Sequence, residues 1–149
     1  MDDIDMLPIY LDKIKKQIKK DIDIDLKKYS LSNMHGMHLM CLYKNSNGLT
    51  LNELTERIKI DKANTTRAIT DLMLKGYVTK DNKIRGYKVI LTPKGLEIAS
   101  LFYNHHHRRM KQILEIFNNQ EKKQMLSFLK RIINKLDEED ENEENFKNS

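Results

Sequence analysis

The stretch that decides the fold runs from residue 49 to residue 80 and reads LTLNELTERIKIDKANTTRAITDLMLKGYVTK. Thr50 and Glu53 have the spacing of a capping box, in which each side chain binds the backbone amide of the other residue, so a short helix is expected to begin here. Asp61 can cap a second helix, and Gly76 is placed to end it. Two short helices separated by a tight turn are typical of a helix-turn-helix.

The second of these helices has two contrasting faces. One side is expected to be buried and consists of Thr65, Ala68, Ile69 and Leu72. The opposite side is polar and consists of Lys62, Asn64, Thr66, Arg67 and Thr70. In a helix-turn-helix, the first turns of the second helix enter the major groove of DNA and meet the base edges. We therefore predict that the polar face binds DNA.

Two strand-like runs follow directly, YVTK at 77–80 and YKVIL at 87–91, and they flank the polar loop DNKIRG. The loop carries Lys83 and Arg85. A hairpin after a recognition helix is a wing, whose basic tip can contact the DNA backbone and place a cation in the adjacent minor groove. A charged hairpin can also be no more than a protected sheet edge. Its position next to the polar helix favours the DNA-binding interpretation.

The charges are distributed unevenly along the chain. The net charge is +5, but the segment DEEDENEE at 137–144 holds seven of the 22 acidic residues. With Lys147 as the one base of residues 137–149, that tail carries −6, which leaves about +11 for residues 1–136. A basic surface attracts polyanions, nucleic acid first among them, although an anionic membrane has the same sign. We expect the acidic tail to be disordered.

Four further helices complete a mainly α-helical fold. An amphipathic helix over residues 8–28 is predicted by an apolar stripe at spacings of three and four, made of Leu7, Leu11, Ile14, Ile18, Ile22 and Leu26. Ser32 can cap the next helix, and a long one is expected over residues 92–117. The last is predicted over residues 120–136, with an inward side made of Met125, Phe128, Leu129, Ile132, Ile133 and Leu136.

Several classes of protein are excluded by composition. No apolar run approaches the roughly 20 residues that cross a bilayer, and no secretory leader is visible at the N-terminus. We therefore expect a cytoplasmic protein that does not bind membranes. Cys41 is the single cysteine and lies in the apolar stretch HLMCLY, where we expect it to be unreactive. No phosphate-binding loop, Cys-x-x-Cys pair or spaced Ser/His/Asp set is present, so we predict no enzymatic activity.

Together with NKIRGYKVILTPKG at 82–95, the opening stretch resembles the MarR family of bacterial transcriptional regulators. The most specific parts are VILTPKG, the junction from Lys75 to Val78, and the Arg-Gly pair of the wing. The resemblance covers the whole chain in element order. It implies a homodimer whose first and last helices interleave, bound to a pseudo-palindromic operator in double-stranded DNA. It also implies repression that is released by a small-molecule effector, by oxidation or, more rarely, modulated by metal.

This resemblance divides the chain into four parts. Residues 1–32 would form an N-terminal dimerisation helix and residues 33–95 a winged helix-turn-helix. Residues 96–136 would form C-terminal dimerisation helices, and residues 137–149 the acidic disordered tail. The residues expected to bind DNA are Lys62, Asn64, Thr66, Arg67, Thr70, Lys83 and Arg85.

Histidines suggest an alternative. The run at 105–107 lies where zinc-responsive members of the family have a histidine-rich stretch, but neighbouring helix residues point about 100° apart, so at most two could bind one ion. The candidate ligands are His35, His38 and His106. Gly36 and Met37 stand where those members have an acid and a histidine. We predict no metal or cofactor, and the alternatives are a zinc-responsive regulator and a winged-helix protein-interaction module without specific DNA binding.

Overall fold

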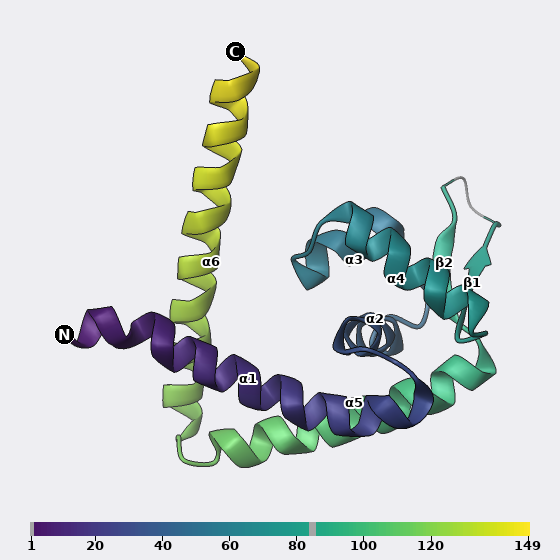
Figure 1. Ribbon diagram of the computed structural model, residues 1–149, viewed down its shortest axis with the longest axis horizontal. Coiled ribbons are helices and arrows are strands. Elements are labelled where there is room, and N and C mark those ends of the chain that lie inside the picture. Colours follow the sequence, from purple (N-terminus) through teal and green to yellow (C-terminus); the bar gives the residue numbers. More distant parts are fainter. Residues whose placement is uncertain (1, 84–85) are drawn as a thin grey trace. The chain divides into compact units, whose positions relative to one another are not determined.

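The computed structural model describes residues 2–83 and 86–149 and forms two compact units, Met1–His107 and Arg108–Ser149 (Figure 1). The first unit contains the short 3-10 helices η1 (Asp3–Met6) and η2 (Lys27–Tyr29), the helices α1 (Leu7–Leu26), α2 (Asn33–Tyr43), α3 (Leu51–Ile58) and α4 (Lys62–Leu74), and the strands β1 (Val78–Asp81) and β2 (Lys88–Leu91). Helix α5 (Pro93–Leu114) begins in the first unit, and α6 (Asn119–Asn148) belongs to the second. The predicted fold class, mainly α with a β-hairpin, is confirmed.

The hydrogen bonds of the predicted helix caps are present in the structure. The Thr50 hydroxyl accepts the Glu53 amide at 3.1 Å, and the Glu53 carboxylate accepts the Thr50 amide at 2.8 Å, which closes the capping box of α3. Asp61 accepts the Asn64 amide at 2.7 Å and starts α4. Local hydrogen bonds encoded within four residues of sequence therefore fix where both helices of the helix-turn-helix begin.

One hydrophobic core joins α2, α3, α4 and the hairpin in the first unit. Its fully buried apolar side chains include Leu26, Leu39, Leu54, Leu72 and Val89. The four residues predicted on the inner face of α4 are all buried. Because α4 packs through this face, its opposite face is directed away from the core.

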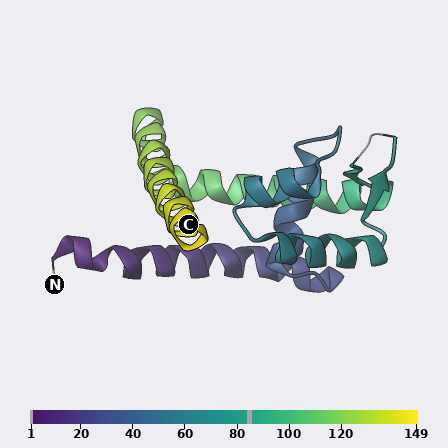
Figure 2. The same cartoon turned by 90° about the horizontal axis from the view of Figure 1, so that it is seen from above.

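The hairpin is an antiparallel pair in which Val78 faces Leu91 and Asp81 faces Lys88. Leu49 adds a bridge to Val89 on the other side of β2, so the loop before α3 is tied to the wing. Figure 2 shows the hairpin beside the end of α4, from which β1 continues after Gly76. Gly76 adopts a φ of +80°, the left-handed conformation expected of a residue that stops a helix.

The C-terminal region differs from the sequence prediction. Helix α6 continues to Asn148, so the acidic tail is helical rather than disordered. No glycine or proline follows Asn119, and glutamate is a good helix former, so nothing in the sequence ends the helix at residue 136. Lys135 and Glu139 add an ion pair at 3.3 Å across one helical turn. Helix α5 instead ends at Leu114, three residues before the predicted 117.

Two apolar stripes are exposed on the single chain, one on α6 that was expected to face inward and one on α1. No residue of α6 is buried, and the stripe that was predicted to pack inward is exposed except for the half-buried Met125. On α1, Leu7, Leu11 and Ile14 are exposed, whereas Leu26 is fully buried. The sequence pattern identified the apolar faces correctly, but among residues 2–83 and 86–149 no side chain covers these parts of them.

Gly95→Ala is expected to destabilise the fold by about 3 kcal/mol. A Cβ atom at Gly95 would lie 1.8 Å from the Tyr77 carbonyl oxygen, a backbone atom at the base of the wing. Gly36→Ala is the control, because its Cβ atom would meet side-chain atoms of Leu26, at 3.0 Å, and no backbone atom. Urea denaturation measures both, and equal losses would contradict the close approach at Gly95.

Candidate nucleic-acid interface

The turn between α3 and α4 is fixed by backbone conformation and by a pair of hydroxyls. Lys59 ends α3 with a φ of +61°, which reverses the chain direction. The Thr55 and Thr65 hydroxyl oxygens lie 2.8 Å apart, with Thr65 fully buried, so a hydrogen bond joins the two helices inside the motif. The sequence placed Thr65 on the buried face but gave no sign of its partner.

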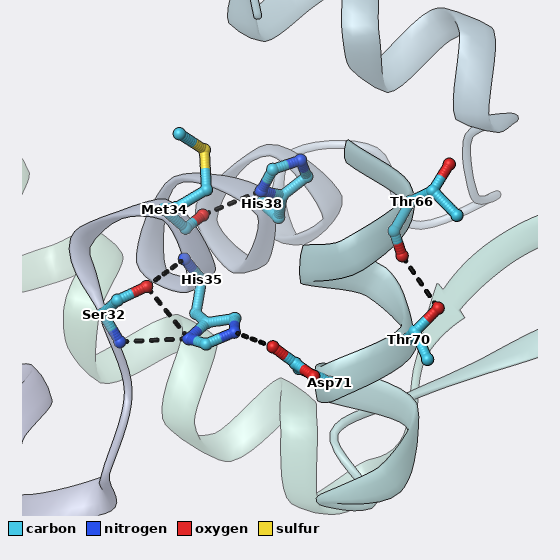
Figure 3. Close-up of polar contacts among 7 residues, drawn as sticks. All are labelled: Ser32, Met34, His35, His38, Thr66, Thr70 and Asp71. Carbon is cyan, nitrogen blue, oxygen red and sulfur yellow. Dashed lines mark hydrogen bonds and ion pairs between the residues drawn. The ribbon is translucent and has the colours of Figure 1, made fainter. Parts of the chain in front are cut away.

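The outer face of α4 carries the side chains predicted to meet DNA. Lys62, Thr66, Arg67 and Thr70 are exposed, and Asn64 is half-buried. The Thr66 hydroxyl donates to the Lys62 carbonyl at 2.9 Å. The Thr70 hydroxyl donates to the Thr66 carbonyl at 2.8 Å, as Figure 3 shows. Each hydroxyl oxygen therefore keeps lone pairs free to accept from a base, while its proton is held by the helix.

Arg67 is held by a chain of hydrogen bonds along the first turns of α4. Its guanidinium donates to the Asn64 side-chain oxygen at 2.6 Å, and the Asn64 side-chain nitrogen donates to Asp61 at 2.8 Å. Asn64 therefore uses both ends of its amide within the helix and orients Arg67. This restraint was not visible in the sequence, which placed the two residues side by side as independent contacts.

The wing presents further positive charge. Lys83 is exposed, and its backbone amide donates to the Asp81 carboxylate at 3.1 Å, which fixes the turn after β1. The Lys80 ammonium lies 4.3 Å from the centre of the Tyr87 ring. Arg85, predicted to enter the minor groove, lies outside the described residues.

The base of the wing is anchored to the recognition helix. The Tyr77 amide donates to the Leu72 carbonyl at 2.9 Å, and the Thr92 hydroxyl donates to the Gly76 carbonyl at 2.6 Å. Lys94 reaches the Lys75 carbonyl at 2.9 Å. The residues of the sequence signature VILTPKG therefore hold the end of α4 and the start of α5 against the hairpin.

His35 joins the start of α2 to α4 (Figure 3). Its Nδ1 atom accepts the Ser32 amide at 3.0 Å, so in the neutral ring the proton is on Nε2, which faces the Asp71 carboxylate at 3.4 Å. His35 therefore occupies the position that glutamate or glutamine usually holds in a capping box. It was predicted only as a possible zinc ligand, and this contact with α4 was missed.

The three candidate zinc ligands are not brought together. His38 is fully buried, and its Nδ1 atom lies 2.7 Å from the Met34 carbonyl (Figure 3). Burial, followed by the charges of the neighbouring His107 and His105, lowers the pKa of His106. His105 instead pairs with Asp25 of α1. Within residues 2–83 and 86–149, no three side chains of histidine, cysteine or acid converge on one point.

His38→Leu is expected to make stability less sensitive to acid. Burial is the main cause that lowers the pKa of His38 below its usual 6.5. Because the unfolded chain then binds more protons than the folded one, this residue contributes stability above about pH 6.5, and that contribution declines as the pH falls through its unfolded pKa. Urea denaturation at pH 7.5 and 5.5, at one protein concentration, measures the change. His107→Gln is the exposed control, and an unchanged pH dependence in His38→Leu would contradict the account.

Cys41 is half-buried, and burial raises the pKa of its thiol, with a smaller opposing effect from Arg57. A thiol with a raised pKa is mostly protonated at neutral pH and reacts slowly. These surroundings agree with the unreactive cysteine that the sequence predicts.

In the part of the chain that is described, no helix has the length and apolar character needed to span a bilayer.

Comparisons with known proteins agree with this architecture. A family model described as MarR family matches residues 31–83. The HTH-type transcriptional regulator BilQ of Clostridioides difficile (strain CD3) is 30% identical over 120 residues, which are 78% of this chain and 80% of BilQ. A MarR protein from Peptoclostridium difficile DA00132 has a TM-score of 0.77 at 27% identity, over 90% of this chain and 89% of that one.

A more distant solved structure extends the likeness of fold. The Staphylococcus aureus MepR-DNA complex has a TM-score of 0.76 at 19% identity, over 85% of this chain and 94% of that one. The similarity to BilQ and the match of the family model to the helix-turn-helix confirm the resemblance noted from the sequence. MarR proteins regulate transcription and are not enzymes. The chain belongs to the MarR family of transcriptional regulators.

Proposed function

We propose that the protein is a homodimeric repressor that acts in the cytoplasm on a pseudo-palindromic DNA operator and releases it in response to a small-molecule effector. In each protomer, Arg67 and Thr66 on α4 would read base edges, while Lys83 of the wing would contact the DNA backbone and Arg85 would enter the adjacent minor groove. The observation that carries the proposal is the exposed polar face of α4, with Arg67 held in place by Asn64, beside a basic hairpin.

The DNA-binding part is supported by geometry and charge. A helix that is buried on one face and exposes Lys62, Arg67 and short hydroxyl side chains on the other can approach the major groove closely. MepR, whose fold is similar, has been solved bound to DNA. The order of α3, α4 and hairpin is the one in which winged proteins place a helix in the major groove and a wing on the backbone.

The homodimer is supported by the uncovered apolar faces. Helix α6 has an open groove of about 420 Å³ whose lining includes Phe128, Ile132 and Leu136. Soluble proteins seldom expose a continuous apolar face unless another molecule covers it. A two-fold dimer would let the same faces of two chains cover each other.

The proposal of repression and of an effector rests on family membership alone.

A mobility-shift assay with DNA from the protein's own promoter region tests the proposed function. We expect a discrete complex that withstands excess competitor DNA of random sequence, because specific binding exceeds non-specific binding by at least about 1,000-fold. A protein that serves only as an interaction module would give weak binding that salt removes and that shows no preference for sequence. That second result would contradict the proposal.

Lys83→Ala is expected to lower affinity for the operator and for random DNA by similar factors. A lysine that contacts a phosphate contributes counterion release and little sequence discrimination. The slope of log affinity against log salt concentration (the salt slope) should therefore fall in magnitude by about one. Arg85→Ala should behave alike, with an additional loss on operators that have A·T-rich flanks. Fluorescence anisotropy at several salt concentrations measures both. An unchanged affinity and slope in the folded, dimeric double variant would contradict a role for the wing.

A further inference from the structure

A polar cavity of about 310 Å³ lies between the loop that follows α2, the helix α3 and the strand β2. None of the residues assigned to the proposed DNA-binding face lines it. Its charged residues are three bases, Lys44, Arg57 and Lys88, and one acid, Glu53, and the Lys44 ammonium lies 4.6 Å from the centre of the Tyr103 ring of α5. The lining therefore carries a net charge of +2, which favours an anionic ligand.

Arg57 is held in place at this cavity by Asn45. The Arg57 guanidinium donates to the Asn45 side-chain oxygen at 2.9 Å, and the Asn45 side-chain nitrogen donates to the Cys41 carbonyl at 2.8 Å, near the end of α2. A guanidinium has five N–H donors, so this bond leaves others to meet a ligand. Because Asn45 is anchored at both ends, part of the entropy cost of ordering Arg57 is met before a ligand arrives.

The loop that forms another wall is fixed against β2. Gly48 has a φ of +85°, and a Cβ atom there would lie 2.6 Å from the Ile90 side chain and 2.8 Å from the Val89 carbonyl oxygen. Leu49 and Val89 exchange two backbone hydrogen bonds, at 2.7 and 3.1 Å. The cavity is therefore bounded by backbone that is held at close range rather than by a loosely attached loop.

Lys88 supplies the charge on the wing side. Among the described residues, its ammonium has no carboxylate within ion-pairing distance. The Glu53 carboxylate accepts the Thr50 amide at 2.8 Å, in the capping box of α3. That amide, with the charges of Lys88 and Arg57, lowers the pKa of Glu53, so the acid stays ionised and the bases still outnumber it.

We propose that this cavity binds a phosphate-type oxyanion between Arg57 of α3 and Lys88 of β2. Guanidinium and ammonium groups bind such oxygens through charge-assisted hydrogen bonds. The group can come from two sources, a free phosphate compound or a backbone phosphate of DNA that extends past α4 and the wing. In either case the anion would connect α3, the first helix of the helix-turn-helix, to the wing. The DNA contacts proposed above, at α4 and at the wing tip, do not include this one.

The first arm of the test is a phosphorus NMR titration of the full-length protein with inorganic phosphate, in the absence of DNA. If the source is a free compound, we expect saturable binding that weakens about tenfold in Arg57→Gln and in Lys88→Gln, because each loses a hydrogen bond to a charged group. Lys123→Gln removes the same charge from α6 and should bind phosphate like the wild type. Circular dichroism melting checks that each variant is folded, and an alanine at the same position replaces any glutamine variant that is not.

The second arm measures the salt slope of DNA binding with long and short duplexes. If the source is a backbone phosphate, inorganic phosphate shows no saturable binding. Arg57→Gln and Lys88→Gln should then each lower the magnitude of the salt slope by about one, on the long duplex only. The proposal is overturned if phosphate does not bind saturably and the slopes stay unchanged, or if Lys123→Gln gives the same losses. If the wild-type protein itself does not bind DNA specifically, the proposed function is wrong. The phosphate titration then still shows whether the cavity binds an oxyanion.

Discussion

Ile132→Glu is expected to convert the protein from a dimer to a monomer at micromolar concentration. Ile132 is 47% exposed on the single chain and lines the apolar groove of α6. If the groove is covered by a second chain, the new carboxylate is buried without a partner, and two-fold symmetry places it in the interface twice. We expect the dimer to weaken by about 1,000-fold or more.

Analytical ultracentrifugation measures this change, with the wild type expected at twice the chain mass of 17.7 kDa. Asn134→Glu is the matched control, because it adds the same charge to an exposed polar position on the same helix. Leu11→Glu, on the exposed stripe of α1, should behave like Ile132→Glu. A wild-type monomer, or a dimer that tolerates both apolar substitutions, would contradict the proposed interface and with it the palindromic operator.

Arg67→Ala is expected to cost about 1–3 kcal/mol in binding to the preferred operator and much less on random DNA. The reason is that a base contact discriminates sequence, whereas a phosphate contact adds affinity on every sequence. Anisotropy titrations on the operator, on operators changed at one position, and on random DNA measure the difference. Equal losses on all of these duplexes would mean that Arg67 contacts phosphate and does not read a base.

The hydrogen bond from Arg67 to Asn64 allows a sharper version of this experiment. Asn64→Ala leaves the guanidinium in place but removes the group that orients it. We expect a smaller loss of operator affinity than in Arg67→Ala, and a double variant no weaker than Arg67→Ala alone. Additive losses would show that Asn64 makes a separate contact with DNA.

Features that depend on a few neighbouring residues were predicted well from the sequence. The capping box of Thr50 and Glu53, the cap of Asp61 and the helix stop at Gly76 all rely on bonds or dihedral angles within one turn. The inner face of α4 follows from helical spacing alone. The helix-turn-helix and its wing could therefore be placed before the structure was known.

Features that depend on contacts between distant residues were missed. The hydroxyl pair of Thr55 and Thr65, and the approach of Gly95 to the Tyr77 carbonyl, exist only once separate elements pack together. His35 was considered as a metal ligand because its residue type suggests one, whereas the fold uses it to cap α2 and to face Asp71. Residue type shows what a side chain is able to do, and tertiary packing selects one of those roles.

The C-terminal prediction failed for a different reason. A high density of acidic residues favours disorder, but the segment after Leu136 lacks glycine and proline and follows a helix that is already formed. Extending a helix adds one hydrogen bond for each residue fixed, which is far less costly than starting one. The apolar stripe on α6 was recognised, but a single sequence does not tell whether its own chain or a second one covers it.

Selection of bound DNA from a random pool, followed by sequencing, tests the central claim most directly. A homodimer that reads bases through α4 is expected to enrich two inverted half-sites whose centres lie about one helical turn, or 10 base pairs, apart. The enrichment should be lost with Ile132→Glu and should change at one position of each half-site with Arg67→Ala. A pool with no enriched sequence, or a single half-site bound by one chain, would contradict the account.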